Sequence, residues 1–452
     1  MLITKTSSDI AKSSQFLFAV LGLSIAIFMS NLDIAMINIA LPQISRELNI
    51  NFTVSIWAIT SYQLVMAALI LPLAFLADKF GYRPVFQIGL IVFTVASLFC
   101  GLAQTIEQLI WARALQGLGA AAILATNIAL IRQLYPTQKL GLGLGVNAFL
   151  LALGFVTGPI FATIILSHFH WSWIFWLNIP MAILSYFLCK SLPKNEENTF
   201  KSMNILSILL SITMFSSIIF ALASFSISNS LLNTWIFLTV GLISGILLYL
   251  RDAKHRHPIF PVDLFKNVIF SLSLITAFFG FVTQGLGLVA LPYIFFSLNY
   301  SAQEMALFIL AWPMMGAITA PVAGILSNRI SPAYLGGCGL LLLSAGLGSI
   351  AYFLGEWPKY MTFIALLLCG IGFGLFFAPN QRMLMSNLPM SRSGIAGGML
   401  NISRIIGQTF GASLVAISIH FSSNSVVVML IIGAIAAFLG SLASLYRLKY
   451  SA

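Results

Sequence analysis

The chain is short of charge, because only 7% of its 452 residues are Asp, Glu, Lys or Arg. Hydrophobic residues make up 60% of it, and its mean hydropathy is +1.01. A soluble domain with this balance would expose far too much apolar surface. The shortage of charge therefore excludes an ordinary soluble protein and indicates one that crosses a membrane many times.

Three further scarcities narrow the function. The four cysteines stand far apart inside apolar runs, which excludes the usual disulfide and metal spacings, and the five histidines lie at or outside the ends of these runs. No G-x-x-x-x-G-K-[ST] phosphate loop occurs. We therefore expect no cofactor and no metal, and both ATP-driven transport and an intramembrane enzyme are poorly supported.

Long apolar runs are what the sequence does contain. Runs of roughly 18 residues or more, separated by Gly, Pro and charged clusters, predict an all-α polytopic membrane protein with fourteen spans. The predicted spans are 15–41, 52–75, 84–104, 106–132, 142–167, 171–190, 203–226, 233–250, 269–295, 302–327, 333–353, 358–386, 394–418 and 425–446.

The basic residues test this arrangement. Of 22 Lys and Arg residues, 18 fall on one side of the fourteen spans, Arg46 and Lys359 fall on the other, and Arg113 and Arg404 lie within spans. Because cytoplasmic loops hold an excess of Lys and Arg, we expect both termini in the cytoplasm and the protein in the cytoplasmic membrane. This also explains the net charge of +11 without a nucleic-acid partner.

The second half of the chain repeats features of the first. The triplet Gly145, Gly154 and Gly158 recurs 253 residues later as Gly398, Gly407 and Gly411, and Ala-Leu-Pro at 40–42 recurs at 290–292. We therefore predict two related six-helix halves, 1–190 and 269–452, joined by a segment, 191–268, that holds two extra spans. Parallel repeats of this kind place a substrate site at their interface near the membrane midplane.

Six stretches in order carry a resemblance to a known family. They are LDIAMINIALP (32–42), LADKFGYRP (76–84), RALQGLGAA (113–121), GVNAFLLALGFVTGPIFAT (145–163), WSWIFWLNIP (171–180) and NISRIIGQTFG (401–411). Over nearly its whole length the chain resembles the major facilitator superfamily, and specifically its drug:proton antiporters with fourteen spans. It departs from the family pattern at Ala74 and Ala162, which usually are Gly, and at Ser172, which usually is Arg.

This resemblance implies roles for several residues. The acid at Asp33 is implied to bind protons or substrate, and Arg113 to take part in proton transfer. The span 2–3 loop is implied to gate the transporter, with Asp78 placed at the N-terminus of the helix over 394–418, where the helix dipole favours an anion. The implied gating residues are Asp78, Lys79, Gly81, Arg83, Gly154, Gly158 and Pro159. Gly154 and Gly158 could equally serve close helix packing.

Depth along the helices places Asp33 near Arg113. Asp33 lies nine residues before Pro42, or about 13 Å from the outer end of its span, and Arg113 lies about 10 Å below the start of its own span. We therefore expect a buried ion pair, with a hydrogen bond from Gln116. The alternative is a salt bridge that merely joins two spans. Against it, Asp33 is the only acid away from the ends of a predicted span, and acids there are costly and usually functional.

The sequence finally predicts a cavity and its contents. We expect its lining to include Asn38, Gln63, Gln116, Asn147, Gln284, Tyr293, Phe377, Asn380, Asn401 and Arg404. With only one acid available, the expected cargo is neutral, anionic or singly cationic, because a dication would lack counter-charges. We expect a monomeric proton-coupled exporter of small amphiphilic compounds. A dedicated exporter of one metabolite, siderophore or lipid remains an alternative, and a non-transporting sensor is less well supported.

Overall fold

A computed structural model describes residues 14–50, 52–193, 205–228, 231–253, 258–298, 300, 302–389, 392–421 and 425–450. Within these ranges the chain is built of helices and contains no β-strand, which confirms the predicted all-α class. Parts of the joining segment predicted at 191–268 lie outside the described residues.

The first six-helix half follows the predicted spans closely. Its first helix is longer than expected, because α2 runs through Pro42 to Glu47 instead of ending near residue 41. The sixth predicted span is a short helix and a longer one, interrupted at Leu177. The elements are α2 (Ser14–Glu47), α3 (Phe52–Ser55), α4 (Trp57–Phe80), α5 (Tyr82–Leu102), α6 (Ile106–Leu134), α7 (Leu140–His168), α8 (Trp173–Trp176) and α9 (Asn178–Leu188).

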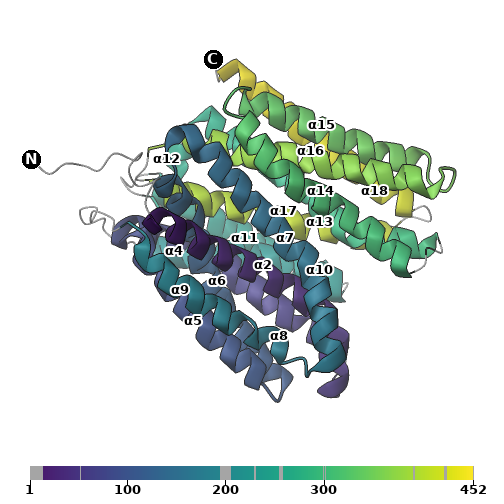
Figure 1. Ribbon diagram of the computed structural model, residues 1–452, viewed down its shortest axis with the longest axis horizontal. Helices are drawn as coiled ribbons and strands as arrows, with labels where there is room; N and C mark the ends of the chain where they lie inside the picture. Colours follow the sequence, from purple (N-terminus) through teal and green to yellow (C-terminus); the bar gives the residue numbers. More distant parts are fainter. Residues whose placement is uncertain are drawn as a thin grey trace, which may run out of the picture.

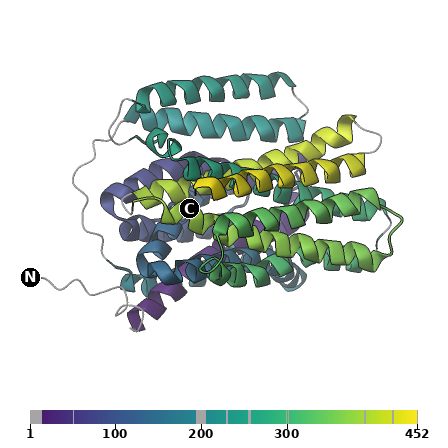
Figure 2. The ribbon, with the colours of Figure 1, turned by 90° about the horizontal axis from the view of Figure 1, so that it is seen from above.

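The rest of the chain continues the pattern. Two helices, α10 (Ile205–Ser228) and α11 (Leu231–Asp252), stand at the positions of the extra spans, and Figure 2 shows them paired along one side of the bundle. They are followed by α12 (Val262–Phe265), α13 (Val268–Ser297), α14 (Ala302–Leu326), α15 (Pro332–Tyr352), α16 (Lys359–Ser386), α17 (Ser393–Phe421) and α18 (Ser425–Tyr446).

The helices are long and apolar, as an integral membrane protein requires. In the part of the chain that the structure describes, thirteen helices are long and apolar enough to cross a membrane. The helix at the remaining predicted position, α17, is not among them, and it carries Asn401, Arg404 and Gln408 near its middle. The count of fourteen spans therefore stays a prediction.

Small residues set the packing inside each half, and they do so in the same way twice. In the first half, Gly154 and Gly158 of α7 lie against the backbone of α2, where a Cβ on Gly158 would come within 2.3 Å of Ala35. In the second half, Gly407 and Gly411 of α17 lie against α13, where a Cβ on Gly411 would come within 2.1 Å of the Val282 carbonyl. The repeat at an offset of 253 is therefore a repeat of helix packing.

The two halves meet at one end of the bundle. There α7 packs on α14 and α17 packs on α4, and α2 begins toward this end in Figure 1. We call it the basic end, because α4 and α5 meet there at Gly81, with Lys79 at the end of α4 and Arg83 at the start of α5. Toward the opposite end the halves diverge (Figure 1).

Candidate functional site

The acid in the first helix is paired as the depth estimate predicts. Asp33 of α2 and Arg113 of α6 form a salt bridge with 2.7 Å between Oδ2 and Nη1, and both side chains are fully buried. The residues are 80 positions apart in sequence, so the pair ties two helices together within the first half. A buried pair costs far less free energy than either ion alone, which explains how both charges are accommodated here.

Two amides complete the surroundings of the carboxylate. Gln116 Nε2 donates to Asp33 Oδ1 at 3.1 Å, and its Oε1 accepts from Arg113 Nη1 at 2.5 Å, as predicted. Asn178, the first residue of α9, donates to the same Asp33 oxygen at 2.7 Å. Asn178 lies in the stretch WSWIFWLNIP but was not predicted from the sequence to contact Asp33. We call Asp33, Arg113, Gln116 and Asn178 the charge site; its members come from α2, α6 and α9.

The arginine of the charge site also contacts α4. Arg113 Nε donates to the carbonyl oxygen of Ala58 at 3.1 Å, and its guanidinium carbon lies 4.2 Å from the ring centroid of Tyr62. Its Nη2 has no hydrogen-bond partner among the described residues, and neither has the Tyr62 hydroxyl. The guanidinium is thus held by a carboxylate from α2, by a carbonyl and an aromatic face from α4, and by an amide from its own helix α6.

At the basic end, Asp78 makes the contact that the family resemblance implies. Its Oδ1 accepts a hydrogen bond from the backbone nitrogen of Gly394 at 3.1 Å, at the start of α17, and from the Tyr82 hydroxyl at 2.7 Å. A carboxylate at a helix N-terminus is stabilised by the unpaired backbone N–H groups and the dipole. Because a Cβ on Gly394 would lie 2.4 Å from this oxygen, the contact also needs glycine there.

The other residues predicted to gate the transporter are placed as follows. Gly81 links α4 to α5 with φ of 102°, which few other residues adopt, and Arg83 Nη1 donates to the Leu192 carbonyl at 3.0 Å. Lys79 lies at the end of α4, 5.0 Å above the Phe80 ring. Gly154, Gly158 and Pro159 belong to α7, and the two glycines face α2 rather than the interface between the halves, which favours their packing role.

Further contacts at the basic end were not anticipated from the sequence. Arg132 of α6 donates to the Ser393 hydroxyl at 2.6 Å and also to the Leu388 carbonyl, so it joins the first half to the loop before α17. Two glycines also touch across the interface, Gly141 of α7 and Gly324 of α14, where a Cβ on either would lie 2.2 Å from the carbonyl oxygen of the other. In this conformation the basic end is therefore closed.

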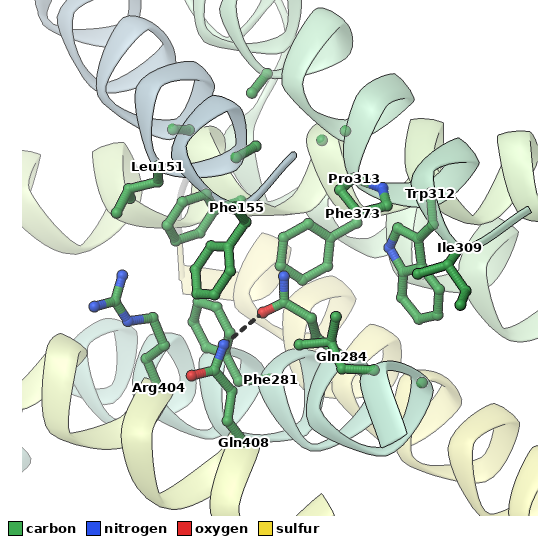
Figure 3. A pocket seen from close by; sticks show the side chains of 18 of the residues that line it. Leu151, Phe155, Phe281, Gln284, Ile309, Trp312, Pro313, Phe373, Arg404 and Gln408 are labelled. Atoms are coloured by element: carbon green, nitrogen blue, oxygen red, sulfur yellow. Dashed lines mark hydrogen bonds between the residues drawn. The ribbon is translucent and has the colours of Figure 1, made fainter. Parts of the chain in front are cut away.

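A pocket lies between the halves, away from the basic end contacts. It holds about 810 Å³ of space between atoms, its open mouth included. Figure 3 shows aromatic rings on two sides and three polar side chains, Gln284, Gln408 and Arg404. The lining comes from α7 of the first half and from α13, α14, α16 and α17 of the second.

Three of the ten residues expected in the cavity line this pocket, namely Gln284, Phe377 and Arg404. The other seven do not line it in this conformation. Gln116 belongs to the charge site, Asn380 accepts from Arg447 at 2.7 Å, and Asn401 donates to the Leu124 carbonyl at 3.0 Å. Asn147 accepts from Asn127 at 2.8 Å in a smaller pocket; Asn38, Gln63 and Tyr293 lie at least partly exposed on their helices.

The missed lining residues are mostly apolar. They include Leu151, Phe155, Phe281, Ile309, Trp312, Pro313, Phe373 and Gln408. A periodic pattern of polar and apolar residues could have indicated which side of each helix faces the pocket. Helices such as α7, however, are apolar on nearly all sides. The sequence therefore identifies the polar residues without telling which of them face the pocket.

The fold is that of known membrane transporters. The structure superposes on that of the proton:xylose symporter XylE with a TM-score of 0.70 and 14% sequence identity, covering 97% of this chain and 96% of the other. The family profile of the Major Facilitator Superfamily matches residues 23–412 and 272–451. The chain belongs to the Major Facilitator Superfamily, whose members are transporters and not enzymes.

Three relatives are similar along most of their length. The uncharacterized transporter YebQ of Escherichia coli is 37% identical over 95% of both chains. The riboflavin transporter RibZ of Clostridioides difficile is 30% identical over 88% of both. The multidrug resistance protein Stp of Mycobacterium tuberculosis is 29% identical over 87% of this chain and 74% of its own.

Proposed function

We propose that this transporter exports small amphiphilic compounds across the cytoplasmic membrane in exchange for protons. It would act as a monomer of the fourteen-span drug:proton antiporter type, with its basic end in the cytoplasm, as the distribution of Lys and Arg favours. The observation that carries the proposal is the fully buried salt bridge between Asp33 and Arg113.

The charge site is suited to couple a proton to a movement of helices. The Asp33 carboxylate accepts from Arg113, Gln116 and Asn178, so its negative charge holds α2, α6 and α9 together. Protonation would remove that charge and weaken the three hydrogen bonds, since bonds to a charged acceptor are about twice as strong as neutral ones. The gain or loss of one proton would then change how α2 packs on its neighbours.

Alternating access would require the basic end to open. The contacts that would break include Asp78 with Gly394, Arg132 with Ser393, and Gly141 with Gly324. Most of these are polar or backbone contacts without interlocked large side chains, so two conformations of similar free energy are physically reasonable. Opening there, combined with closure at the other end, would carry the pocket from one side of the membrane to the other.

The relatives support export of drug-like compounds, because one of them is a multidrug resistance protein. A second candidate is a dedicated transporter of one metabolite. It is favoured by the similarity to a riboflavin transporter, and an aromatic pocket with a pair of glutamines would suit a flat ring system with several hydrogen-bonding atoms.

Transport by purified protein in proteoliposomes would test the proposal. With an imposed pH gradient, uptake of a neutral, an anionic and a singly cationic fluorescent compound would be compared between wild type and Asp33→Asn. The matched control is Glu356→Gln, which makes the same chemical change at an exposed residue. We expect gradient-driven transport of at least one compound in wild type and in the control, and none in Asp33→Asn. Normal transport by Asp33→Asn would refute the proton role.

A further inference from the structure

Arg404 is a buried cation that has neither an acidic partner nor a hydrogen-bond acceptor among the described residues. It lies in the middle of α17, only 9% exposed, and lines the pocket between the halves. Figure 3 shows its guanidinium at the edge of the pocket, on the side of Leu151 and beside Gln408. Its side chain forms no hydrogen bond or ion pair that involves any described residue, and the described lining of the pocket contains neither Asp nor Glu.

The other three buried arginines of the described residues show what Arg404 lacks. Arg113 is paired with Asp33, and Arg392 is paired with Asp263 at 2.6 Å. Arg447, fully buried at the end of the last helix, donates to Ser273 at 2.8 Å, Asn380 at 2.7 Å and Ser444 at 2.6 Å. This fold thus supplies acceptors for a guanidinium wherever it buries one for structural reasons. An unpaired buried charge is expensive, so the pocket at Arg404 has room for an acceptor that the protein does not provide.

The rest of the pocket specifies the shape of the missing group. Its walls carry five aromatic side chains: Phe155, Phe281, Trp312, Phe373 and Phe377. Trp312 lies on the far side from Arg404 in Figure 3, and its Nε1 is buried with no hydrogen-bond partner among the described residues. Between them, Gln408 Nε2 donates to Gln284 Oε1 at 2.9 Å, which leaves one amide NH2 and one amide oxygen for a ligand.

We propose that this pocket binds organic monoanions with a flat aromatic body. The acid group would pair with the guanidinium of Arg404, whose planar fork matches a carboxylate, and the rings would lie among the five aromatic side chains. This rests on the proposed function and names the class of its substrate. It narrows the cargo expected from the acid count, because a cationic compound would meet the Arg404 charge with no carboxylate in the pocket to offset it.

The proposal is tested by three probes that share one ring system. Anthracene-9-carboxylate, 9-anthracenemethanol and 9-(aminomethyl)anthracene differ only in carrying a negative charge, no charge or a positive charge. Their binding to the detergent-solubilised protein can be measured by fluorescence anisotropy for wild type, Arg404→Gln and Arg404→Lys. The matched control is Arg329→Gln, which removes the same charge from an exposed loop.

We expect wild type and the control to bind the carboxylate at least tenfold more tightly than the alcohol, and the ammonium compound most weakly. Arg404→Gln should bind carboxylate and alcohol equally, with the alcohol affinity within twofold of wild type. Arg404→Lys, which keeps the charge but not the fork, should retain part of the preference and decides the matter if Arg404→Gln does not fold.

Other results would overturn the proposal. One is that the wild type binds none of the probes, or binds the carboxylate no more tightly than the alcohol. The other is that Arg404→Gln still prefers the carboxylate. Either would mean that Arg404 pairs with a carboxylate of this chain in another conformation or serves packing alone. A wild type that prefers the carboxylate but shows no pH-driven transport would instead refute the proposed function and leave this inference standing.

Discussion

Replacing Gly141 by alanine should open the basic end of the transporter. The added Cβ would lie 2.2 Å from the Gly324 carbonyl oxygen and 2.8 Å from the Ser327 hydroxyl, whereas ordinary contacts are 3.4 Å or more. Because the nearest atom is backbone of a packed helix, α7 and α14 must move apart by about 1 Å. Overpacking of this kind costs about 1–3 kcal/mol.

This cost falls only on the conformation in which the basic end is closed. A difference of about 1–3 kcal/mol changes the ratio of two conformations by about 5- to 150-fold. Alanine also stabilises a helix relative to glycine by about 1 kcal/mol, so the control variant must replace a helical glycine by alanine as well. Gly348→Ala provides it, because a Cβ there has its nearest neighbour, Ala434, at 4.0 Å.

Spin labels on cysteines at Lys139 and Arg329 would report the distance across the basic end. Both residues are exposed, and they belong to opposite halves. In a background with Cys338 replaced by serine, we expect a shorter distance in wild type and Gly348→Ala, and an added longer one in Gly141→Ala. Gly324→Ala should act alike, since its Cβ would lie 2.2 Å from the Gly141 carbonyl oxygen. Equal distance distributions in Gly141→Ala and Gly348→Ala would refute this account of the closed state.

Three further predictions follow from the charges. Arg113→Ala should lower the thermal unfolding midpoint in detergent more than Asp33→Asn does. It leaves the Asp33 carboxylate buried without its counter-ion, at a cost of about 3–5 kcal/mol in stability, whereas the asparagine of Asp33→Asn still offers a hydrogen-bond acceptor. Equal shifts of the midpoint would contradict this. A cysteine at Glu356 should react with an impermeant reagent in intact cells, and one at Arg329 only after permeabilisation; the reverse would invert the topology. Exchange of a monoanion for one proton should move two net charges across the membrane, whereas exchange of a neutral compound for one proton moves one. Since each charge contributes about 2.3 kcal/mol per 100 mV, export of the monoanion should depend more strongly on membrane potential. Equal dependence of the two transport rates on potential, measured in vesicles, would contradict this charge count.

What could be predicted from the sequence depended on local rules. Span positions follow from runs of apolar residues, and the depth of Asp33 and Arg113 follows from the rise per residue of a helix. The placement of Asp78 at the start of α17 came from the family resemblance. These inferences need no knowledge of how a helix is rotated about its axis.

The lining of the pocket depends on that rotation. Asn380 and Gln116 are polar residues deep in apolar helices, as pocket residues would be, yet one satisfies Arg447 and the other satisfies Arg113 and Asp33. Nothing in the local sequence distinguishes an amide that serves a buried arginine from one that serves a ligand. Asn178 was missed for the same reason, since its partner is 145 positions away.

In the proposed mechanism, the movement of protons and the movement of substrate are coupled through Asp33. This coupling can be measured as a flow of protons that is driven by a gradient of the substrate. Proteoliposomes with an internal pH-sensitive dye and no initial pH difference would receive an inward gradient of a transported compound. The account predicts that wild type and Glu356→Gln move protons outward as the compound enters, and that Asp33→Asn moves none. Entry of the compound through wild type without any change of internal pH would contradict the account.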